Sequence, residues 1–237
     1  MLQVRSAPVL GLGVMGWVAG ILFVLVLCAL VFRKAERWGP ANLVTMTRAL
    51  LVGAVTALVA DSFVRYVPAA LIVTIASVAL VLDAVDGYVA RRSGSVTAFG
   101  ARFDMEVDAF LILLLSVYVS RSLGWWVLAI GAMRYAYVAA GWVLRWLRRP
   151  APPRYWCKVV AAIQAIVLTV AASGLLPEIV NLVAVACALG LLIESFGRDV
   201  LWQWRHRHPS MPGTGVDVPG AAQRPEPVKH VHKLGRV

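Results

Sequence analysis

Seven stretches of this 237-residue sequence are almost uninterrupted hydrocarbon over lengths near 20 residues. A helix needs about 20 predominantly apolar residues to cross the hydrocarbon core of a bilayer. The mean hydropathy is +0.78 and only 15% of the residues are charged, which is far from what a water-soluble domain exposes. We therefore expect an all-α, polytopic membrane helix bundle, with membrane helices at 9–32, 42–63, 67–90, 104–120, 124–144, 158–174 and 178–196.

The basic residues are distributed unevenly between the loops. Loops 33–41, 91–103 and 145–157 are rich in Lys and Arg, whereas the loops on the opposite side hold only Arg65 and Arg121. Lys and Arg favour cytoplasmic loops, and seven helices place all three basic loops on one side. We therefore expect a multi-pass protein of the cell membrane with this side in the cytoplasm.

The hydrophobic pattern ends near residue 197, and the rest of the chain is rich in Pro, Gly and basic residues. Such a composition cannot build a packed core, so we predict a basic, disordered cytoplasmic tail over 197–237. The sequence shows no nucleic-acid motif, no P-loop and no Rossmann glycine pattern. The net charge of +11 is best explained by contact with the lipid bilayer, and no nucleic-acid partner is expected.

Carboxylates gather at one place between apolar stretches, at Asp83, Asp86, Asp104 and Asp108. On helices, the first two share a face and so do the last two, since they are three and four residues apart. Anions beside hydrocarbon need neutralising charge, and oxygen ligands favour Mg²⁺ or Mn²⁺ over zinc. Two such ions held by carboxylates would clamp a phosphoryl group. Glu106 lies about half a turn away and is expected to face elsewhere.

The segment between the two acidic pairs carries residues suited to phosphate binding. Gly87 allows a ligand to approach the backbone, and Arg91 offers a permanently charged guanidinium for phosphate oxygens. Thr97 and Gly100 follow in the same segment. These residues, taken with the aspartates, predict a diphosphate-binding site.

The whole segment reads D-x2-D-G-x2-A-R-x8-G-x3-D-x3-D, from Asp83 to Asp108. This pattern resembles the signature of the CDP-alcohol phosphatidyltransferase family at every spacing. The six helices after the first are also similar to the six-helix core of that family. The resemblance divides the chain into an N-terminal transmembrane helix with its basic loop (1–41), the transferase core (42–196) and the tail (197–237).

The resemblance implies an enzyme of phospholipid biosynthesis that transfers a phosphatidyl or related phospho-alcohol group from a CDP-linked donor to an alcohol and releases CMP. It implies two Mg²⁺ or Mn²⁺ ions per site. Asp83 would bridge the two metals, and Asp86 and Asp104 would ligate them. Asp108 would ligate the second metal and act as general base on the acceptor hydroxyl. A homodimer is a further implication of the resemblance.

The resemblance also nominates residues for the CDP moiety. Gly87, Arg91 and Thr97 would hold it, and the segment PANLVTMTR is similar to the donor-binding segment of the family, which adds Asn42 and Thr45. Asn42, Thr45 and Arg48 recur every three residues and so lie loosely along one helix face.

Arg134 falls near the middle of the predicted helix 124–144, where an unpaired guanidinium is costly. Two roles are open: a structural pair with a carboxylate, or binding of an anionic acceptor together with Arg154 and Lys158. The second role favours a phosphorylated acceptor. For the same reason we favour CDP-diacylglycerol with a polar alcohol over a CDP-linked headgroup with a lipid alcohol.

An alternative function is a divalent-cation transporter or a metal-binding membrane scaffold, because intramembrane carboxylates also mark ion pathways. A transporter needs a second polar cluster toward the other face, through which the ions can leave. The outer halves of the predicted helices offer little for this beyond Asp61, Arg65, Glu178 and Asn181.

Overall fold

Seven α-helices and one short 3-10 helix make up the regular structure of the computed structural model, which describes residues 11–34, 40–93, 98–144 and 155–205. Side chains at 30–34, 40–45, 86–93, 98–99, 101–102 and 155 lie outside this description. The described residues contain no strand. The helices are α1 (Val14–Lys34), α2 (Pro40–Asp61), α3 (Ala69–Ser93), α4 (Ala98–Leu123), α5 (Leu128–Val143), α6 (Tyr155–Ser173) and α7 (Glu178–Arg205), and the 3-10 helix η1 (Trp125–Val127) precedes α5.

Proline and glycine mark several helix boundaries. Pro40 occupies the first position of α2, where its missing N–H group costs nothing. Gly174 follows the last residue of α6 with a φ of 65°, a left-handed conformation that favours glycine and ends many helices. Gly124 has a φ of 103° between α4 and η1. These positions explain why the apolar pattern breaks into separate helices.

Each predicted span contains one long helix, so the expected all-α bundle is confirmed. The end of the last helix was predicted too early, because α7 continues past residue 196 to Arg205. Gln203 is buried and accepts a hydrogen bond of 3.1 Å from the hydroxyl of Tyr137 in α5. Contact with α5 therefore accompanies the extension of α7 into the segment that we assigned to the tail. Residues 206–237 of that segment lie outside the described part of the chain.

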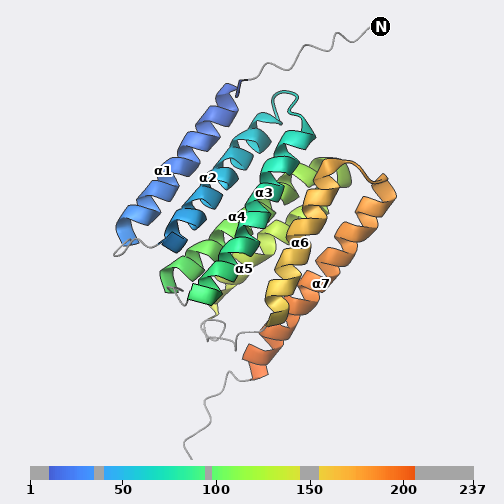
Figure 1. Cartoon of the computed structure of the whole chain (residues 1–237). Helices are drawn as coiled ribbons and strands as arrows, with labels where there is room; N and C mark the ends of the chain where they lie inside the picture. The colour runs from blue at the N-terminus through green and yellow to red at the C-terminus, as the bar shows by residue number, and fades with distance from the viewer. Residues whose placement is uncertain (1–10, 35–39, 94–97, 145–154, 206–237) are drawn as a thin grey trace, which may run out of the picture.

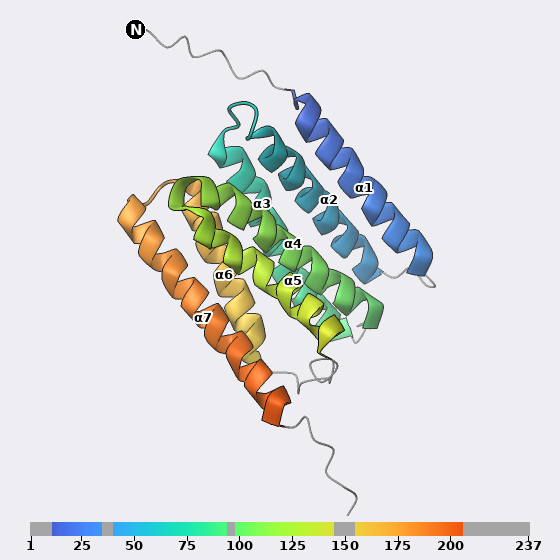
Figure 2. The same ribbon diagram turned by 180° about the vertical axis from the view of Figure 1, so that it is seen from behind.

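The helices lie roughly side by side in a bundle (Figures 1 and 2). Helix α1 packs on α2, and α2 packs on both α3 and α4. Helix α4 in turn contacts α5 and α6, and α6 contacts α7. The interior is apolar, and its fully buried large side chains include Val52, Ile72, Leu115, Leu168 and Val185. Helices α2 and α4 thus connect the two sides of the bundle.

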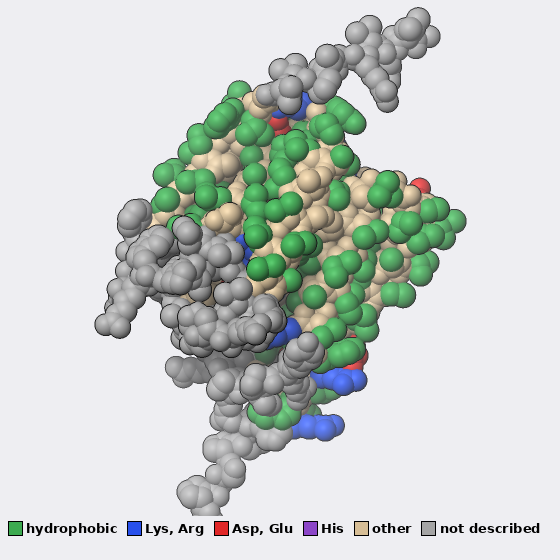
Figure 3. All heavy atoms as spheres, in the orientation of Figure 1, with side chains coloured by type: hydrophobic (Ala, Val, Ile, Leu, Met, Phe, Trp, Pro, Cys, Tyr) green, Lys and Arg blue, Asp and Glu red, His purple; other side chains and the backbone are tan. Residues whose placement is uncertain are grey.

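The outer surface of the bundle is apolar as well. Large hydrophobic side chains are exposed along α1 and α7. Figure 3 shows hydrophobic side chains spread over the visible face of the bundle. Three helices in the described residues are long and apolar enough to span a membrane, at Trp125–Val143, Trp156–Ser173 and Glu178–Arg205. Shorter apolar helices cover Val14–Ala29 and Ala69–Val85. An apolar exterior around an apolar core is the arrangement of a helical membrane bundle.

Asp61, at the end of α2, attaches α1 to the rest of the bundle. Its side chain is buried and accepts hydrogen bonds from the backbone N–H groups of Gly13, at 2.8 Å, and Gly16, at 3.3 Å. Arg65 Nε lies 2.5 Å from the same carboxylate and supplies the balancing charge. The carboxylate of Asp61 therefore caps the N-terminus of α1 from a neighbouring helix.

Gly131 allows α5 to approach the backbone of α4 closely. A Cβ atom added at Gly131 would lie 2.6 Å from the Cα of Leu113 and 3.1 Å from the buried Oγ of Ser116. A backbone atom cannot move aside in the way that the end of a flexible side chain can. The position of α4, which carries part of the acidic cluster, therefore depends on a small residue at 131.

We expect Gly131→Ala to lower the stability of the protein by about 1–3 kcal/mol, because the added methyl group overpacks the contact between α4 and α5. Gly190→Ala is the matched control, since a Cβ at that exposed helical position meets nothing within 4 Å. The midpoints of thermal unfolding in detergent check this prediction. Equal midpoints for the two variants would contradict it.

Candidate active site

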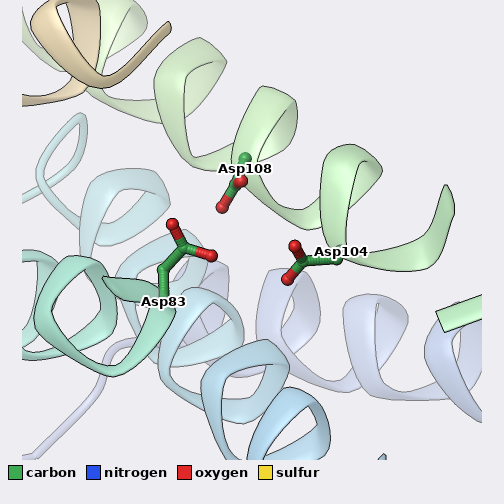
Figure 4. A group of neighbouring side chains, drawn as sticks. All are labelled: Asp83, Asp104 and Asp108. Atoms are coloured by element: carbon green, nitrogen blue, oxygen red, sulfur yellow. The ribbon is translucent and has the colours of Figure 1, made fainter. Parts of the chain in front are cut away.

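Three of the four predicted aspartates lie together near one end of the bundle. Asp83 extends from α3, and Asp104 and Asp108 extend from adjacent turns of α4 (Figure 4). One carboxylate oxygen from each residue lies within 4.8 Å of the other two. The spacing of four residues places Asp104 and Asp108 on one face of α4, as the sequence predicted. The three carboxylates therefore converge from two helices.

Arg48 of α2 binds all three of these carboxylates. Its NH1 atom forms ion pairs with Oδ1 of Asp83 and, at 2.5 Å, with Oδ1 of Asp104. Its NH2 atom lies 2.9 Å from Oδ1 of Asp108 and donates a hydrogen bond of 3.1 Å to the backbone carbonyl of Asp104. A single guanidinium thus connects α2, α3 and α4.

The four charged groups do not balance, because three carboxylates and one guanidinium leave a net charge of −2 (1 − 3 = −2). The carboxylates are also accessible, with side-chain exposures of 36% for Asp83, 38% for Asp104 and 35% for Asp108. Hard divalent cations prefer oxygen ligands of this kind. The residues present therefore fit Mg²⁺ or Mn²⁺ at this cluster.

The remaining predicted ligands and donor-binding residues lie at the ends of the same helices. The last turns of α3 contain Asp86, Gly87 and Arg91, and the first turns of α2 contain Asn42 and Thr45. The structure describes the backbone of these five residues but not their side chains. Thr97 and Arg154 lie outside the described residues. The backbone of Asp86 is about one turn beyond Asp83, so the sequence assigns it to the same end of the bundle.

Arg134 of α5 forms an ion pair with Glu106, with 2.6 Å between its NH2 atom and Oε1. The pairing with a carboxylate that the sequence left open is therefore present, and Glu106 faces away from the acidic cluster toward α5. Arg134 Nε is buried without a hydrogen-bond partner among the described residues. Lys158 of α6, the other described acceptor candidate, is exposed.

The position of Arg48 was not predicted, because the sequence placed it on a face with two donor-binding candidates. The structure places its side chain, which is only 1% exposed, beneath the aspartates. One signal was available: Arg48 is the only basic residue in the apolar stretch 42–63. An ionisable side chain in such a stretch needs a partner of opposite charge inside the bundle, and the aspartates of the acidic cluster were the available candidates.

Comparison with known families identifies the class of this protein. The family model for CDP-alcohol phosphatidyltransferases matches residues 38–192, which is more than half of the chain. No curated protein and no solved structure matches this chain. The chain belongs to the CDP-alcohol phosphatidyltransferase family and is a membrane enzyme of that class, which transfers a phosphatidyl group from a CDP-linked substrate in phospholipid biosynthesis. Members depend on divalent cations, and the match begins after α1.

If the cluster binds divalent ions, Asp83→Asn will weaken Mn²⁺ binding by about tenfold or more, because a neutral amide replaces a charged ligand. Mn²⁺ at about 100 times the wild-type dissociation constant stabilises the wild type by about 2.7 kcal/mol, whereas the same concentration stabilises a variant that binds tenfold more weakly by only about 1.4 kcal/mol. The Mn²⁺-induced rise in unfolding temperature should therefore be about half as large, or smaller, in the variant. Asp61→Asn, at the other end of the bundle, controls for the loss of a carboxylate. A Mn²⁺-induced shift as large in Asp83→Asn as in the wild type would contradict the prediction.

Proposed function

We propose that this enzyme transfers the phosphatidyl group of CDP-diacylglycerol to the hydroxyl group of a polar alcohol at the cytoplasmic face of the cell membrane, releasing CMP. The observation that carries the proposal is the convergence of Asp83, Asp104 and Asp108 on one accessible cluster with excess negative charge. The family match supports the reaction class. The donor lipid, the polar acceptor and the orientation are inferences from the distribution of charge.

In the proposed mechanism, Asp83, Asp86, Asp104 and Asp108 hold two divalent ions. When bound, these ions neutralise the charge of the diphosphate and of the leaving phosphate. Asp108 takes the proton of the acceptor hydroxyl. The hydroxyl oxygen then forms a bond to the phosphorus of the phosphatidyl group, and the bond from this phosphorus to the oxygen of the CMP phosphate breaks. Positioning supplies most of the rate, because a carboxylate is a weak base.

The orientation in the membrane follows from the basic loops. The ends of α1, α3 and α5, to which these loops are attached, lie at the same end of the bundle (Figure 1). By the preference of Lys and Arg for the cytoplasmic side, this end faces the cytoplasm. CMP and a soluble alcohol are exchanged with that compartment. We further propose that the CDP moiety is bound by Asn42, Thr45, Gly87, Arg91 and Thr97.

For the acceptor, we propose an alcohol that carries a negative charge, such as a phosphorylated one. Arg134 supports this choice, because Glu106 occupies its NH2 atom while its buried Nε has no partner among the described residues. Arg154 and Lys158 are proposed to act with it at the cytoplasmic entrance. A homodimer also remains a prediction from the family.

A cation transporter is less consistent with the opposite end of the bundle. There, the carboxylate of Asp61 is buried and already bound to two backbone N–H groups and to Arg65. A cavity of about 700 Å³ at this end is lined by Arg65 and Arg121. Arg65 is balanced by Asp61, but Arg121 donates to uncharged groups of Ser62, so its positive charge would repel a leaving cation. Divalent-ion flux into proteoliposomes would favour the transporter, and we expect none.

We expect purified enzyme with Mn²⁺ to release CMP from CDP-diacylglycerol only when an acceptor alcohol is present. Asp108→Asn should lower this rate by about a hundredfold or more, because it removes the general base and a metal ligand. Glu178→Gln, an exposed carboxylate in the first turn of α7, controls for the same chemical change elsewhere. Full CMP release by a folded Asp108→Asn variant would refute the assigned base.

We expect Arg134→Gln to raise the KM of a phosphorylated acceptor by about tenfold, since a charged hydrogen bond contributes about 1.5–3 kcal/mol. The KM of the CDP-linked donor should be unchanged. Initial rates with each substrate varied in turn give both constants. If both constants rise together, Arg134 acts through its pair with Glu106 on the structure of the site, and its role in acceptor binding is wrong.

A further inference from the structure

We propose that Arg48 is a positioning residue for metal binding. Its buried guanidinium holds one oxygen of each carboxylate from the interior side of the bundle, so that the cluster is formed before the ions bind. The inference deepens the proposed function and rests on the metal site assigned there. It gives a role to a side chain that belongs to neither the predicted metal ligands nor the predicted substrate contacts.

The packing of α2 is what makes this role possible. Helix α2 contacts both α3, which carries Asp83, and α4, which carries Asp104 and Asp108. From this position Arg48 reaches carboxylates on both neighbouring helices. It also donates a hydrogen bond to the backbone of α4, at the carbonyl of Asp104. The guanidinium therefore fixes the two helices relative to each other at the site.

Burial differs sharply between Arg48 and its partners. Arg48 is 1% exposed, whereas Asp83, Asp104 and Asp108 are each more than one-third exposed. The guanidinium thus lies on the interior side of the cluster, and the carboxylates extend from it toward solvent. In each ion pair Arg48 contacts Oδ1, so the guanidinium does not itself block ligation of a metal by the second carboxylate oxygen. Arg48 and the ions can therefore be bound together.

Electrostatic repulsion explains why such a residue is needed. Three carboxylates with oxygens within 4.8 Å of one another repel strongly, and the apolar surroundings increase that repulsion. Without Arg48, the carboxylates would turn toward solvent and away from one another. Metal binding would then have to bring them back together, which lowers the affinity. Residues that orient metal ligands in this way typically contribute 10- to 100-fold to metal affinity.

The shape of the guanidinium matters in addition to its charge. Arg48 uses two nitrogen atoms to make four contacts in fixed directions, which a planar fork allows. A lysine would supply the same charge from a single ammonium group on a shorter side chain. We therefore expect Arg48→Lys to keep the charge of the site but to lose its geometry.

The test is the dissociation constant of Mn²⁺, measured by EPR on folded, metal-free protein in detergent for the wild type, Arg48→Lys and Arg48→Gln. We expect both variants to bind Mn²⁺ about 10- to 100-fold more weakly. The sign of the effect is diagnostic. Removing a positive charge would by itself strengthen cation binding, so weaker binding must come from the lost orientation of the carboxylates.

Arg198→Gln is the matched control, because it removes a guanidinium whose ion pair is with Glu194 of the same helix, and we expect its affinity for Mn²⁺ to be unchanged. Unchanged or tighter Mn²⁺ binding by folded Arg48→Lys would overturn the inference, since Arg48 would then be a structural residue or a competitor of the metal. If Arg48→Gln fails to fold, Arg48→Lys alone decides. Absence of Mn²⁺ binding in the wild type would instead refute the metal site of the proposed function, and this inference with it.

Discussion

The site depends on the balance between repulsion among three carboxylates and their attraction to one buried guanidinium. Asp83, Asp104 and Asp108 lie close enough to share a cation, and Arg48 contacts all three from the interior. One positive charge is enough to keep the cluster together and too little to neutralise it. The charge that remains among these four groups is what suits the cluster to divalent ions, whereas a fully balanced group of ion pairs would be a purely structural feature.

Helix packing determines which charges can meet. Helix α2 lies against α1, α3 and α4, so a side chain on its inner face can reach carboxylates on two other helices. On its far side, α4 is held against α5 at Gly131, where the two backbones approach too closely for a larger residue. The position of the carboxylates on α4 therefore depends on contacts on both sides of that helix. In an apolar bundle inside a membrane, such close packing replaces the hydrophobic effect as the force that orders the helices.

The sequence predicted the elements of this structure better than their contacts. Apolar stretches of the right length gave the seven helices, and residue spacing placed Asp104 and Asp108 on one face, because both depend on local periodicity. The contact of Arg48 with three aspartates depends on which helices are neighbours, and periodicity carries no information about that. The same limit applies to Gln203, whose bond to Tyr137 accompanies the extension of α7 beyond the apolar stretch. Arg134 shows the intermediate case: the cost of its burial left a carboxylate partner and an anionic acceptor open, and the structure shows a pair with Glu106.

The two ends of the bundle use the same residue types for opposite purposes. At one end, carboxylates outnumber the arginine that binds them and remain exposed to solvent. At the other end, Asp61 is buried, its charge is matched by Arg65, and its oxygens are used to hold the start of α1. Arg121 at that end donates to the backbone carbonyl and hydroxyl of Ser62. Among the described residues, the carboxylates that converge lie at the end with Asp83, while the other end has the bound carboxylate of Asp61 and the exposed Glu178, which begins α7. Cations collected at the first end would meet no second acidic cluster among these residues through which to leave, and this asymmetry suits an enzyme better than a transporter.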